Sequence, residues 1–250
     1  PARATWPNAD RYPVTGGAFW TSFTLDAEPG VLYVPAGNPA PDFDLEARGG
    51  DNLYTNAVIA LDAATGEMLW MHQEHEGPRG ESAPRKLSGR GLAYWTDGRN
   101  DSRIIYVTPG YQMIALDAKT GRPVSTFGKD GIVDLKMDDD QTMDPVTGSV
   151  GYHAAPIIAG NTIVIGAAHL SGGVPVSKSN VKGYVRAYDA VTGKRLWIFH
   201  TIPRPGEFGN DTWEKDSWSY TGNAGVWAQM SADPQLGLVY LPVELPTGDY

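Results

Sequence analysis

The sequence predicts an all-β fold assembled from repeated four-stranded antiparallel units, and three observations carry this prediction. One hairpin phrase occurs three times, the segments before each copy are short and β-rich, and glycine and proline are abundant, with 30 and 19 of 250 residues. Frequent glycine and proline are typical of many short strands joined by turns. No segment keeps the helical period over about twelve residues, so a helical fold is not favoured.

The repeated phrase reads ALDAATGEMLW at 60–70, ALDAKTGRPVS at 115–125 and AYDAVTGKRLW at 187–197. Each copy is expected to form an apolar strand, a tight turn and a second strand. The aspartate can cap the turn with its side chain, and the glycine supplies the positive φ that ends it. The middle copy has Ser125 in place of tryptophan, with Phe127 two residues on, so this hairpin is expected to be the least well packed.

The spacing of these units predicts a β-propeller. Units of about four strands recur at intervals of 55 and 72 residues, which is typical of propeller blades. We expect a single propeller segment over 1–250, with blades at 16–73, 90–128 and 153–200 and a partial blade at 222–250. An open arc of blades leaves sheet edges exposed. The chain is therefore expected to associate with a copy of itself or another chain, or to be a portion of a longer one.

Composition narrows the classes of function. The net charge is −9 with scattered basic residues, so nucleic-acid binding is not expected. Cysteine is absent, which excludes disulfides, thiolate metal sites and cysteine nucleophiles. No run of about 18 apolar residues occurs, and no signal peptide is visible at the start. The serine-hydrolase and P-loop phrases are also absent.

The chain begins and ends on related phrases. GGAFWTSFTLDAEPGVLYVPAGNPAPDF at 16–43 aligns with GNAGVWAQMSADPQLGLVYLPVELPTGDY at 222–250. The alignment sets Trp20 over Trp227 and Tyr33 over Tyr240. The two phrases therefore predict the same kind of blade, present twice.

These phrases resemble those of the pyrroloquinoline quinone (PQQ) dehydrogenases, in their glucose- and alcohol-dehydrogenase-like branch. The repeated hairpin resembles the tryptophan-docking motif of these quinoproteins, and SGRGLAYW at 88–95, HAAPIIAG at 153–160 and the stretch at 181–214 resemble further family phrases. The resemblance covers nearly the whole chain. It implies an eight-bladed propeller, of which about three to four blades are present here, that binds PQQ and calcium in the periplasm. It also implies oxidation of an alcohol, polyol or sugar hydroxyl, with electrons passed to a quinone or cytochrome.

The resemblance assigns cofactor contacts to five residues. Trp20 and Trp227 match the tryptophan that lies flat beneath PQQ, although either can instead be a blade-core residue. Arg90 matches the arginine that pairs with a PQQ carboxylate, and the alternative is a surface salt bridge. His153 and His169 fall where the family has polar PQQ contacts, and the alternative is a hydrogen-bonded core histidine.

The resemblance also implies a calcium ligand. Asn38, in AGNPAPD, matches the asparagine whose side-chain oxygen binds the metal, a ligand type that suits calcium. An ordinary Asn-Pro turn is the alternative. The position aligned with it in the second copy is Leu245, which cannot ligate. If that blade holds the calcium, the neighbouring Glu244 is the expected donor.

The chain departs from the family pattern in three places. Pro84 and Arg85 stand where other members have a vicinal cysteine pair, and no haem CxxCH phrase occurs. The phrase that carries the family's catalytic aspartate, similar to HxxWD, follows neither calcium-like phrase, so the catalytic base is unknown. From His72 onward the order matches the family's first half, whereas 1–70 resemble a later blade. We therefore expect a rearranged or truncated quinoprotein segment. A non-catalytic propeller scaffold, or an inactive fragment that binds partners, is the alternative function.

Two acidic segments have metal-like composition. HQEHE at 72–76 would place its side chains on both faces of a strand, so a metal site there is not favoured. DDDQTMD at 138–144 lacks the glycine and the terminal glutamate of an EF-hand loop, and a solvated acidic loop is expected instead.

Overall fold

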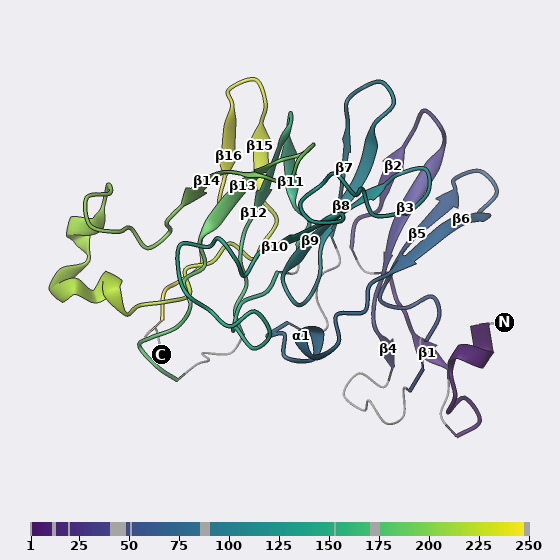
Figure 1. The fold of residues 1–250 in the computed structure, drawn as a ribbon, viewed down its shortest axis with the longest axis horizontal. Coiled ribbons are helices and arrows are strands. Elements are labelled where there is room, and N and C mark those ends of the chain that lie inside the picture. The colour runs from purple at the N-terminus through teal and green to yellow at the C-terminus, as the bar shows by residue number, and fades with distance from the viewer. Residues whose placement is uncertain are drawn as a thin grey trace.

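The computed structural model describes residues 2–11, 14–19, 21–40, 49–50, 52–85, 91–152, 154–170 and 176–247. Three residues predicted for the site, Trp20, Arg90 and His153, lie outside this set. Within the described residues, three four-stranded antiparallel sheets follow one another along the chain, and a two-stranded sheet begins a fourth unit (Figure 1). The predicted all-β architecture, a segment of a β-propeller, is confirmed. No helix in this part of the chain is long and apolar enough to cross a membrane.

Each blade is one sheet, with its strands in chain order. The first contains β2 (Thr24–Asp26), β3 (Val31–Ala36), β5 (Ala57–Asp62) and β6 (Met68–Gln73). The second contains β7 (Leu92–Thr96), β8 (Ser102–Val107), β9 (Gln112–Asp117) and β10 (Ile132–Asp134). The third contains β11 (Ile157–Ala159), β12 (Thr162–Ile165), β13 (Val185–Asp189) and β14 (Arg195–Phe199). The fourth unit contains β15 (Ser231–Asp233) and β16 (Leu238–Tyr240).

The remaining elements are short and lie outside the blades. β1 (Thr15–Gly16) pairs with β4 (Pro39–Ala40). The helical turns are η1 (Ala2–Thr5), α1 (Pro78–Glu81), η2 (Asn210–Thr212) and η3 (Glu214–Ser219).

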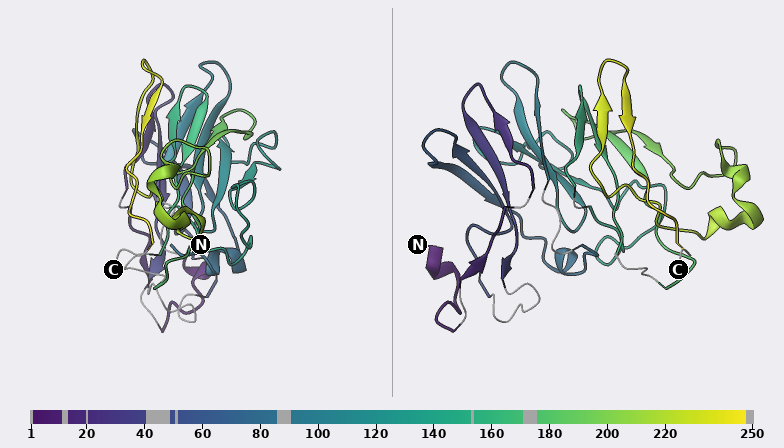
Figure 2. Two further views of the ribbon diagram at one scale, coloured as in Figure 1. Left: turned by 90° about the vertical axis from the view of Figure 1, so that its left-hand side faces the viewer. Right: turned by 180° about the vertical axis from the view of Figure 1, so that it is seen from behind.

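The blades stand side by side in an open arc. The first strands of successive blades contact one another in chain order, β2 with β7, β7 with β11 and β11 with β15. Figure 2 shows the same succession from behind. The middle strands β8, β9, β12 and β13 are covered on both faces by neighbouring blades and are almost entirely buried. Their sequences therefore read as apolar runs rather than as alternating patterns.

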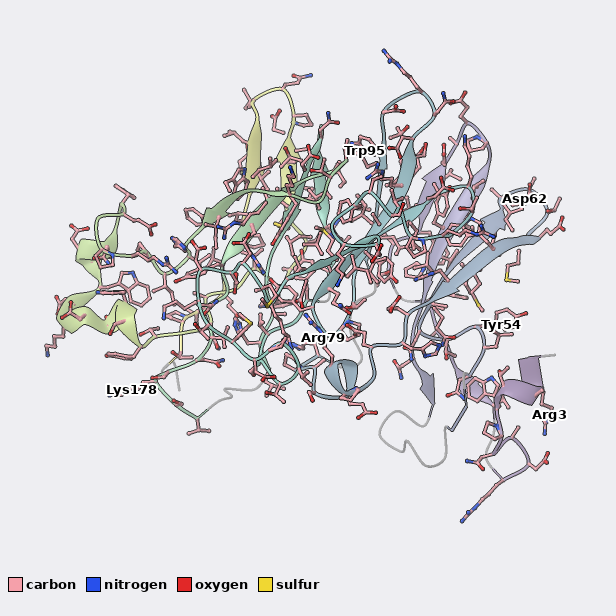
Figure 3. All side chains as sticks on the ribbon, in the orientation of Figure 1. Arg3, Tyr54, Asp62, Arg79, Trp95 and Lys178 are labelled. Carbon is pink, nitrogen blue, oxygen red and sulfur yellow. The ribbon has the colours of Figure 1, made fainter. Side chains whose placement is uncertain are left out.

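The antiparallel order gives the arc two distinct ends. The connections from first to second strand and from third to fourth strand lie at one end, which we name the turn end. Each first strand starts, and each second strand stops, at the opposite end, which we name the loop end. Figure 3 shows Asp62 and Trp95 toward the turn end and Arg79 toward the loop end.

The three repeated turns form as predicted. Oδ1 of Asp62 accepts hydrogen bonds from the backbone N–H groups of Ala64 and Thr65, at 3.0 and 2.7 Å, and from the Thr65 hydroxyl at 2.9 Å. Asp117 accepts from the N–H and hydroxyl of Thr120, and Asp189 caps its own turn in the same way. The glycines that end the turns have φ of 74°, 68° and 71°, a region that side-chain-bearing residues avoid.

Trp70 joins the first blade to the second. Its indole N–H donates to the carbonyl of Ala118, in the next repeated turn, at 3.0 Å. The Tyr33 hydroxyl donates to the same carbonyl at 3.2 Å. The indole ring lies on Gly121, where a Cβ would come within 2.4 Å of ring carbon Cε3. The glycine therefore serves the turn and also leaves room for the tryptophan of the preceding blade.

The middle hairpin joins its neighbour differently, and the expectation that it would pack least well is wrong. Phe127 is fully buried in the main core cluster. The backbone N–H of Gly128 donates to the Thr192 carbonyl at 2.9 Å, and Arg103 donates to the carbonyls of Ala190 and Val191 at 3.0 and 2.7 Å. Arg103 and Gly128 thus contact the third repeated turn, as Trp70 contacts the second. Of the two tryptophans in the repeated hairpins, Trp70 is 9% exposed and Trp197, on β14, is 41% exposed.

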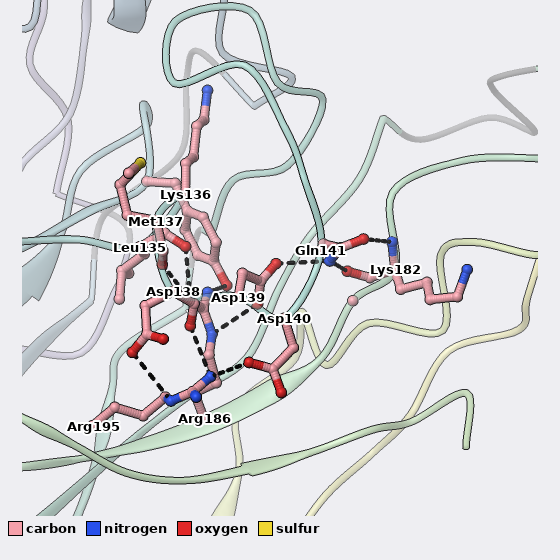
Figure 4. A network of polar contacts seen from close by, with 12 residues as sticks. Leu135, Lys136, Met137, Asp138, Asp139, Asp140, Gln141, Lys182, Arg186 and Arg195 are labelled. Atoms are coloured by element: carbon pink, nitrogen blue, oxygen red, sulfur yellow. Dashed lines mark hydrogen bonds and ion pairs between the residues drawn. The ribbon is translucent and has the colours of Figure 1, made fainter. Parts of the chain in front are cut away.

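The acidic loop is exposed at Asp138 and Asp144, as expected, but Asp139 departs from that expectation (Figure 4). Asp139 is buried, and its Oδ1 lies 3.0 Å from Nε of the fully buried Arg186. Arg186 donates further to the carbonyl of Leu135 at 2.7 Å and to the hydroxyl of Tyr111 at 3.0 Å. A buried guanidinium needs an opposite charge and several acceptors. The second and third blades supply these together, so one aspartate of the run is drawn into the core.

The packing of Trp70 on Gly121 predicts unequal effects for two similar substitutions. Gly66→Ala and Gly121→Ala both place a Cβ at a positive φ, but nothing lies within 4 Å of a Cβ at Gly66. We expect G66A to lower the free energy of unfolding by about 1 kcal/mol and G121A by about 2 to 4 kcal/mol. Urea unfolding followed by circular dichroism measures both. Equal losses would show that Trp70 does not depend on the bare glycine.

The turn caps predict a pH dependence. Hydrogen bonds from the Thr65 backbone and hydroxyl lower the pKa of Asp62 below its usual value of 3.8. Because the pKa is lower in the folded state, the charged carboxylate stabilises the fold fully at pH values above 3.8. That stabilisation is lost as the pH falls through the folded-state pKa. The stability advantage of wild type over D62N should therefore shrink between pH 6 and pH 3. D130N, at an exposed aspartate outside these turns, is the control, and a constant D62N difference contradicts the cap.

Candidate functional site

The predicted site residues that the structure describes all lie at the loop end. Asn38 follows β3, His169 follows β12 and Glu244 follows β16. Trp227 precedes β15. Every second strand stops, and every first strand starts, at this end of the arc, so the topology gathers residues of this kind along one rim.

His169 and Glu244 meet across the seam between the third blade and the fourth unit. Nδ1 of His169 lies 3.0 Å from Oε1 of Glu244, and the backbone N–H of Gly225 donates to the same oxygen at 3.2 Å. The backbone N–H of Glu244 donates in turn to the Gly225 carbonyl at 2.9 Å. The His169 side chain is 2% exposed and the Glu244 side chain 21%. A buried imidazole thus holds a carboxylate that still reaches the surface.

The second ring nitrogen of His169 is buried and has no hydrogen-bond partner among the described residues. Four other buried side-chain atoms share that property, and each lies within 3.6 Å of a carboxylate or guanidinium group. Those pairs are His72 with Glu74 at 3.6 Å, Asp139 with Arg186 at 3.0 Å and His200 with Asp140 at 3.4 Å. His169 Nε2 has no such neighbour in the described part of the chain. Buried polar atoms are normally hydrogen-bonded, and a water or a bound ligand can supply the partner of this one.

Arg85, which precedes the second blade, also contacts this network. Its Nε–H donates to the carbonyl of His169 at 2.6 Å. Arg85 lies in the segment that leads to the second blade, so one chain of contacts runs from Arg85 through His169 to Glu244. The sequence marks Arg85 only as a replacement for a cysteine and does not predict this contact. Its place before a first strand, shared with Trp227, was the signal that could have found it.

Glycines allow the close approach of the segments around His169. A Cβ at Gly183 would lie 2.3 Å from the Cα of Gly225 and 2.9 Å from Cε1 of His169. A Cβ at Gly225 would lie 2.4 Å from the carbonyl oxygen of Ala167. The backbone around the imidazole is therefore in contact on several sides, and His169 has little freedom to turn.

Trp227 lies two residues beyond Gly225 and is 43% exposed. An indole that presents this much surface can stack against a planar ring system. Together with Gly225, which contacts Glu244, it places an aromatic surface at the same end of the arc as the carboxylate and the buried imidazole. This combination suits a flat, acidic cofactor held with a cation.

Asn38 is not part of this neighbourhood. It follows β3, on the opposite flank of the arc from β16 (Figure 1). Its backbone carbonyl accepts a hydrogen bond from Gly17 at 2.7 Å, next to the short pair of β1 and β4. The two predicted calcium ligands therefore belong to separate places on the loop end.

The segment 72–76 is fastened to the second blade. Oε1 of Glu76 accepts from the Thr108 hydroxyl at 2.5 Å, and Oε2 accepts from the N–H of Gly110 at 2.8 Å. Burial raises the pKa of Glu76. Arg79, just beyond, donates to both oxygens of Asp134. These contacts give the segment a structural role in closing the loop end of the blade.

The described residues supply few of the oxygen ligands that a calcium ion needs. No three His, Asp or Glu side chains gather closely enough to hold a metal by themselves in the described ranges. Oε2 of Glu244 accepts no hydrogen bond from any described residue. A carboxylate oxygen of this kind is a ligand that calcium prefers, provided that further oxygens come from elsewhere. Glu244 therefore offers one calcium ligand, and a bound acidic cofactor and water would have to supply the others.

Comparison with known proteins gives the family. The chain matches the family model for the PQQ-type glucose/ethanol/alcohol dehydrogenase β-propeller domain over residues 1–78 and 74–250. It is 31% identical over 211 residues to the glycerol dehydrogenase large subunit of Gluconobacter oxydans (strain 621H), covering 80% of this chain and 27% of that protein. It is 31% identical over 195 residues to the quinohemoprotein alcohol dehydrogenase ADH IIB of Pseudomonas putida, covering 74% of this chain and 24% of that protein.

A solved structure agrees on the fold. The crystal structure of quinohemoprotein alcohol dehydrogenase from Comamonas testosteroni aligns with a TM-score of 0.63 at 20% identity, covering 93% of this chain and 30% of that one. The chain belongs to the PQQ glucose/ethanol/alcohol dehydrogenase family, as a β-propeller segment. It spans about a quarter of the length of the relatives named above. The two matched stretches meet at 74–78, near the point where the family phrases change their order.

The close packing at Gly183 predicts the effect of one added methyl group. G183A should lower the free energy of unfolding by about 1 to 3 kcal/mol, because the Cβ collides with backbone that cannot turn aside. Gly49 is the matched control, since it also has an ordinary φ and a Cβ there would meet Pro7 at 3.6 Å, a normal contact distance. Thermal unfolding of both variants tests the difference. A G183A protein as stable as G49A would contradict the packing described around His169.

Proposed function

We propose that this chain forms part of a PQQ- and calcium-dependent dehydrogenase that oxidises an alcohol, polyol or sugar hydroxyl in the periplasm. The electrons pass to a quinone or a cytochrome. The observation that carries the proposal is the His169–Glu244 pair, whose second ring nitrogen has no partner among the described residues, at the same end of the arc as the exposed Trp227. Membership of the PQQ family supports the choice of cofactor.

Oxidation of a hydroxyl-bearing carbon to a carbonyl releases two electrons and two protons. When bound, PQQ supplies the acceptor for both electrons, and the protein supplies orientation and charge. Trp227 provides a flat apolar surface on which the tricyclic ring can rest. Glu244 would hold a cation through Oε2, and that positive charge would offset the negative charge that a carboxylate-bearing cofactor brings to the site.

The contacts behind Glu244 keep this arrangement in place. His169 and Gly225 hold Oε1, and Arg85 holds the backbone of His169. A carboxylate fixed by two donors loses little freedom when a ligand binds, so more of the binding energy is retained. Arg85 also brings a positive charge to the rim, which favours an acidic cofactor over a neutral one.

The substrate class and the acceptor are proposed from the relatives. Their names specify glycerol and alcohol as substrates, and a further relative is a quinoprotein glucose dehydrogenase from Gluconobacter oxydans (strain 621H). This supports a small molecule with a hydroxyl group as substrate. These 250 residues contain no cysteine and hence no CxxCH phrase for haem attachment. That supports an electron acceptor bound outside this stretch.

A matched pair of tryptophans tests the proposal. Trp227 and Trp197 have similar exposure, at 43% and 41%, but Trp197 lies on β14 away from the Glu244 pair. We expect PQQ to quench wild-type fluorescence in a saturable, calcium-dependent manner. W227F should weaken PQQ binding by about tenfold, the value of one aromatic contact, and W197F should leave it unchanged. Dye-linked oxidation of alcohols and sugars is followed in the same samples.

Two results would contradict this function. Equal PQQ affinity in W227F and W197F would show that the cofactor does not rest on Trp227. Absence of quenching at micromolar PQQ with calcium would remove the cofactor site, and the chain would then be a propeller segment that binds partners.

A further inference from the structure

We infer that His169 is a positioning residue with two faces. Its Nδ1–H fixes Oε1 of Glu244, so that the carboxylate binds the cation through Oε2 alone, and its Nε2 accepts a hydrogen bond from the bound cofactor or a water on it. This inference rests on the proposed function, because it assigns roles within the same site. It concerns residues in which this chain departs from the family phrases.

The carboxylate of Glu244 is asymmetric. Oε1 accepts from Nδ1–H of His169 at 3.0 Å and from the N–H of Gly225 at 3.2 Å. No described residue donates to Oε2, and the side chain is 21% exposed. An oxygen that already accepts two hydrogen bonds is a poorer metal ligand than one that accepts none. Binding through the single oxygen Oε2 follows.

The same contact fixes the tautomer of His169. A carboxylate oxygen can only accept, so the proton of the imidazole must lie on Nδ1. When the ring is neutral, Nε2 then carries a lone pair and can only accept. This nitrogen is buried and has no partner among the described residues. Metal-site histidines commonly have their tautomer set by a carboxylate in this way, with consequences for the ligand they face.

A second histidine shows what a purely structural pair looks like. His200 is also buried, and its Nδ1 lies 2.7 Å from Oε1 of Glu207. Its other nitrogen, however, faces Asp140 at 3.4 Å. Carboxylates thus occupy both sides of His200, whereas the second ring nitrogen of His169 has no partner among the described residues. This difference identifies His169 as the histidine whose Nε2 is available to a bound ligand.

Two amide substitutions separate the faces of His169. The asparagine amide in H169N reaches the place of Nδ1 and can still donate to Glu244, but nothing replaces Nε2. The glutamine amide in H169Q reaches the place of Nε2 and leaves Glu244 without its donor. H200Q is the control, because it alters a similar pair whose partners, Glu207 and Asp140, make no contact with Glu244. Circular dichroism and thermal unfolding establish that each variant is folded.

The readouts are calcium affinity at saturating PQQ and PQQ affinity at saturating calcium, both from tryptophan fluorescence. H169Q should lower calcium affinity by about 10- to 100-fold, the usual effect of removing a partner behind a metal ligand. H169N should keep calcium affinity within about threefold and lower PQQ affinity by about five- to tenfold, the loss of one hydrogen bond. H200Q should change neither affinity.

The tautomer is read independently from nitrogen–proton correlations of the imidazole in protein without PQQ, at pH 8. A proton on Nδ1 and none on Nε2 is expected. A proton on Nε2, or equal calcium affinities in H169N and H169Q, overturns the inference while wild-type binding of PQQ leaves the proposed function standing. Failure of wild type to bind PQQ or calcium overturns both.

Discussion

The contact between successive blades is the constraint on which the rest of this structure depends. Trp70 reaches across the first seam and donates its indole N–H to the Ala118 carbonyl, and the ring can come that close because Gly121 has no side chain. At the second seam Arg103 and the backbone of Gly128 make the corresponding contacts with the third turn. Different side chains thus solve the same geometric problem, which is to satisfy exposed turn carbonyls while two sheets pack face to face.

Fixing the blades at the turn end determines what meets at the loop end. Once the sheets are held in register, the segments after β12 and β16 and those before β7 and β15 lie along one rim. Arg85, His169 and Glu244 come from three such segments, and each contributes one contact to the network. The proposed function depends on the seams, because these three residues belong to different blades. This is the usual relation between a rigid β scaffold and the loops that carry its chemistry.

Much of the fold could be predicted, because local rules govern it. The Asp and Gly of each repeated turn have roles that depend on a few neighbouring residues, and they form as expected. The middle hairpin could not be predicted, since the burial of Phe127 depends on the third blade. The burial of Asp139 could not be predicted either, because only the fold shows that its partner Arg186 lies inside the core. At the site, the phrase alignment singled out His169 and Glu244 separately. Their contact across 75 residues, and that of Arg85, required the arrangement of the blades.

The central claim is that the loop end of the arc, around His169 and Glu244, is where the cofactor binds. Hydrogen–deuterium exchange with and without PQQ and calcium tests it directly, because the two ends of each blade report separately in one experiment. The account predicts slower exchange at the loop end and no change in the repeated turns. Protection of the turns, or of neither end, would contradict it. The loop-end segments are 166–170, 225–230 and 241–246, and the turns are 62–66, 117–121 and 189–193.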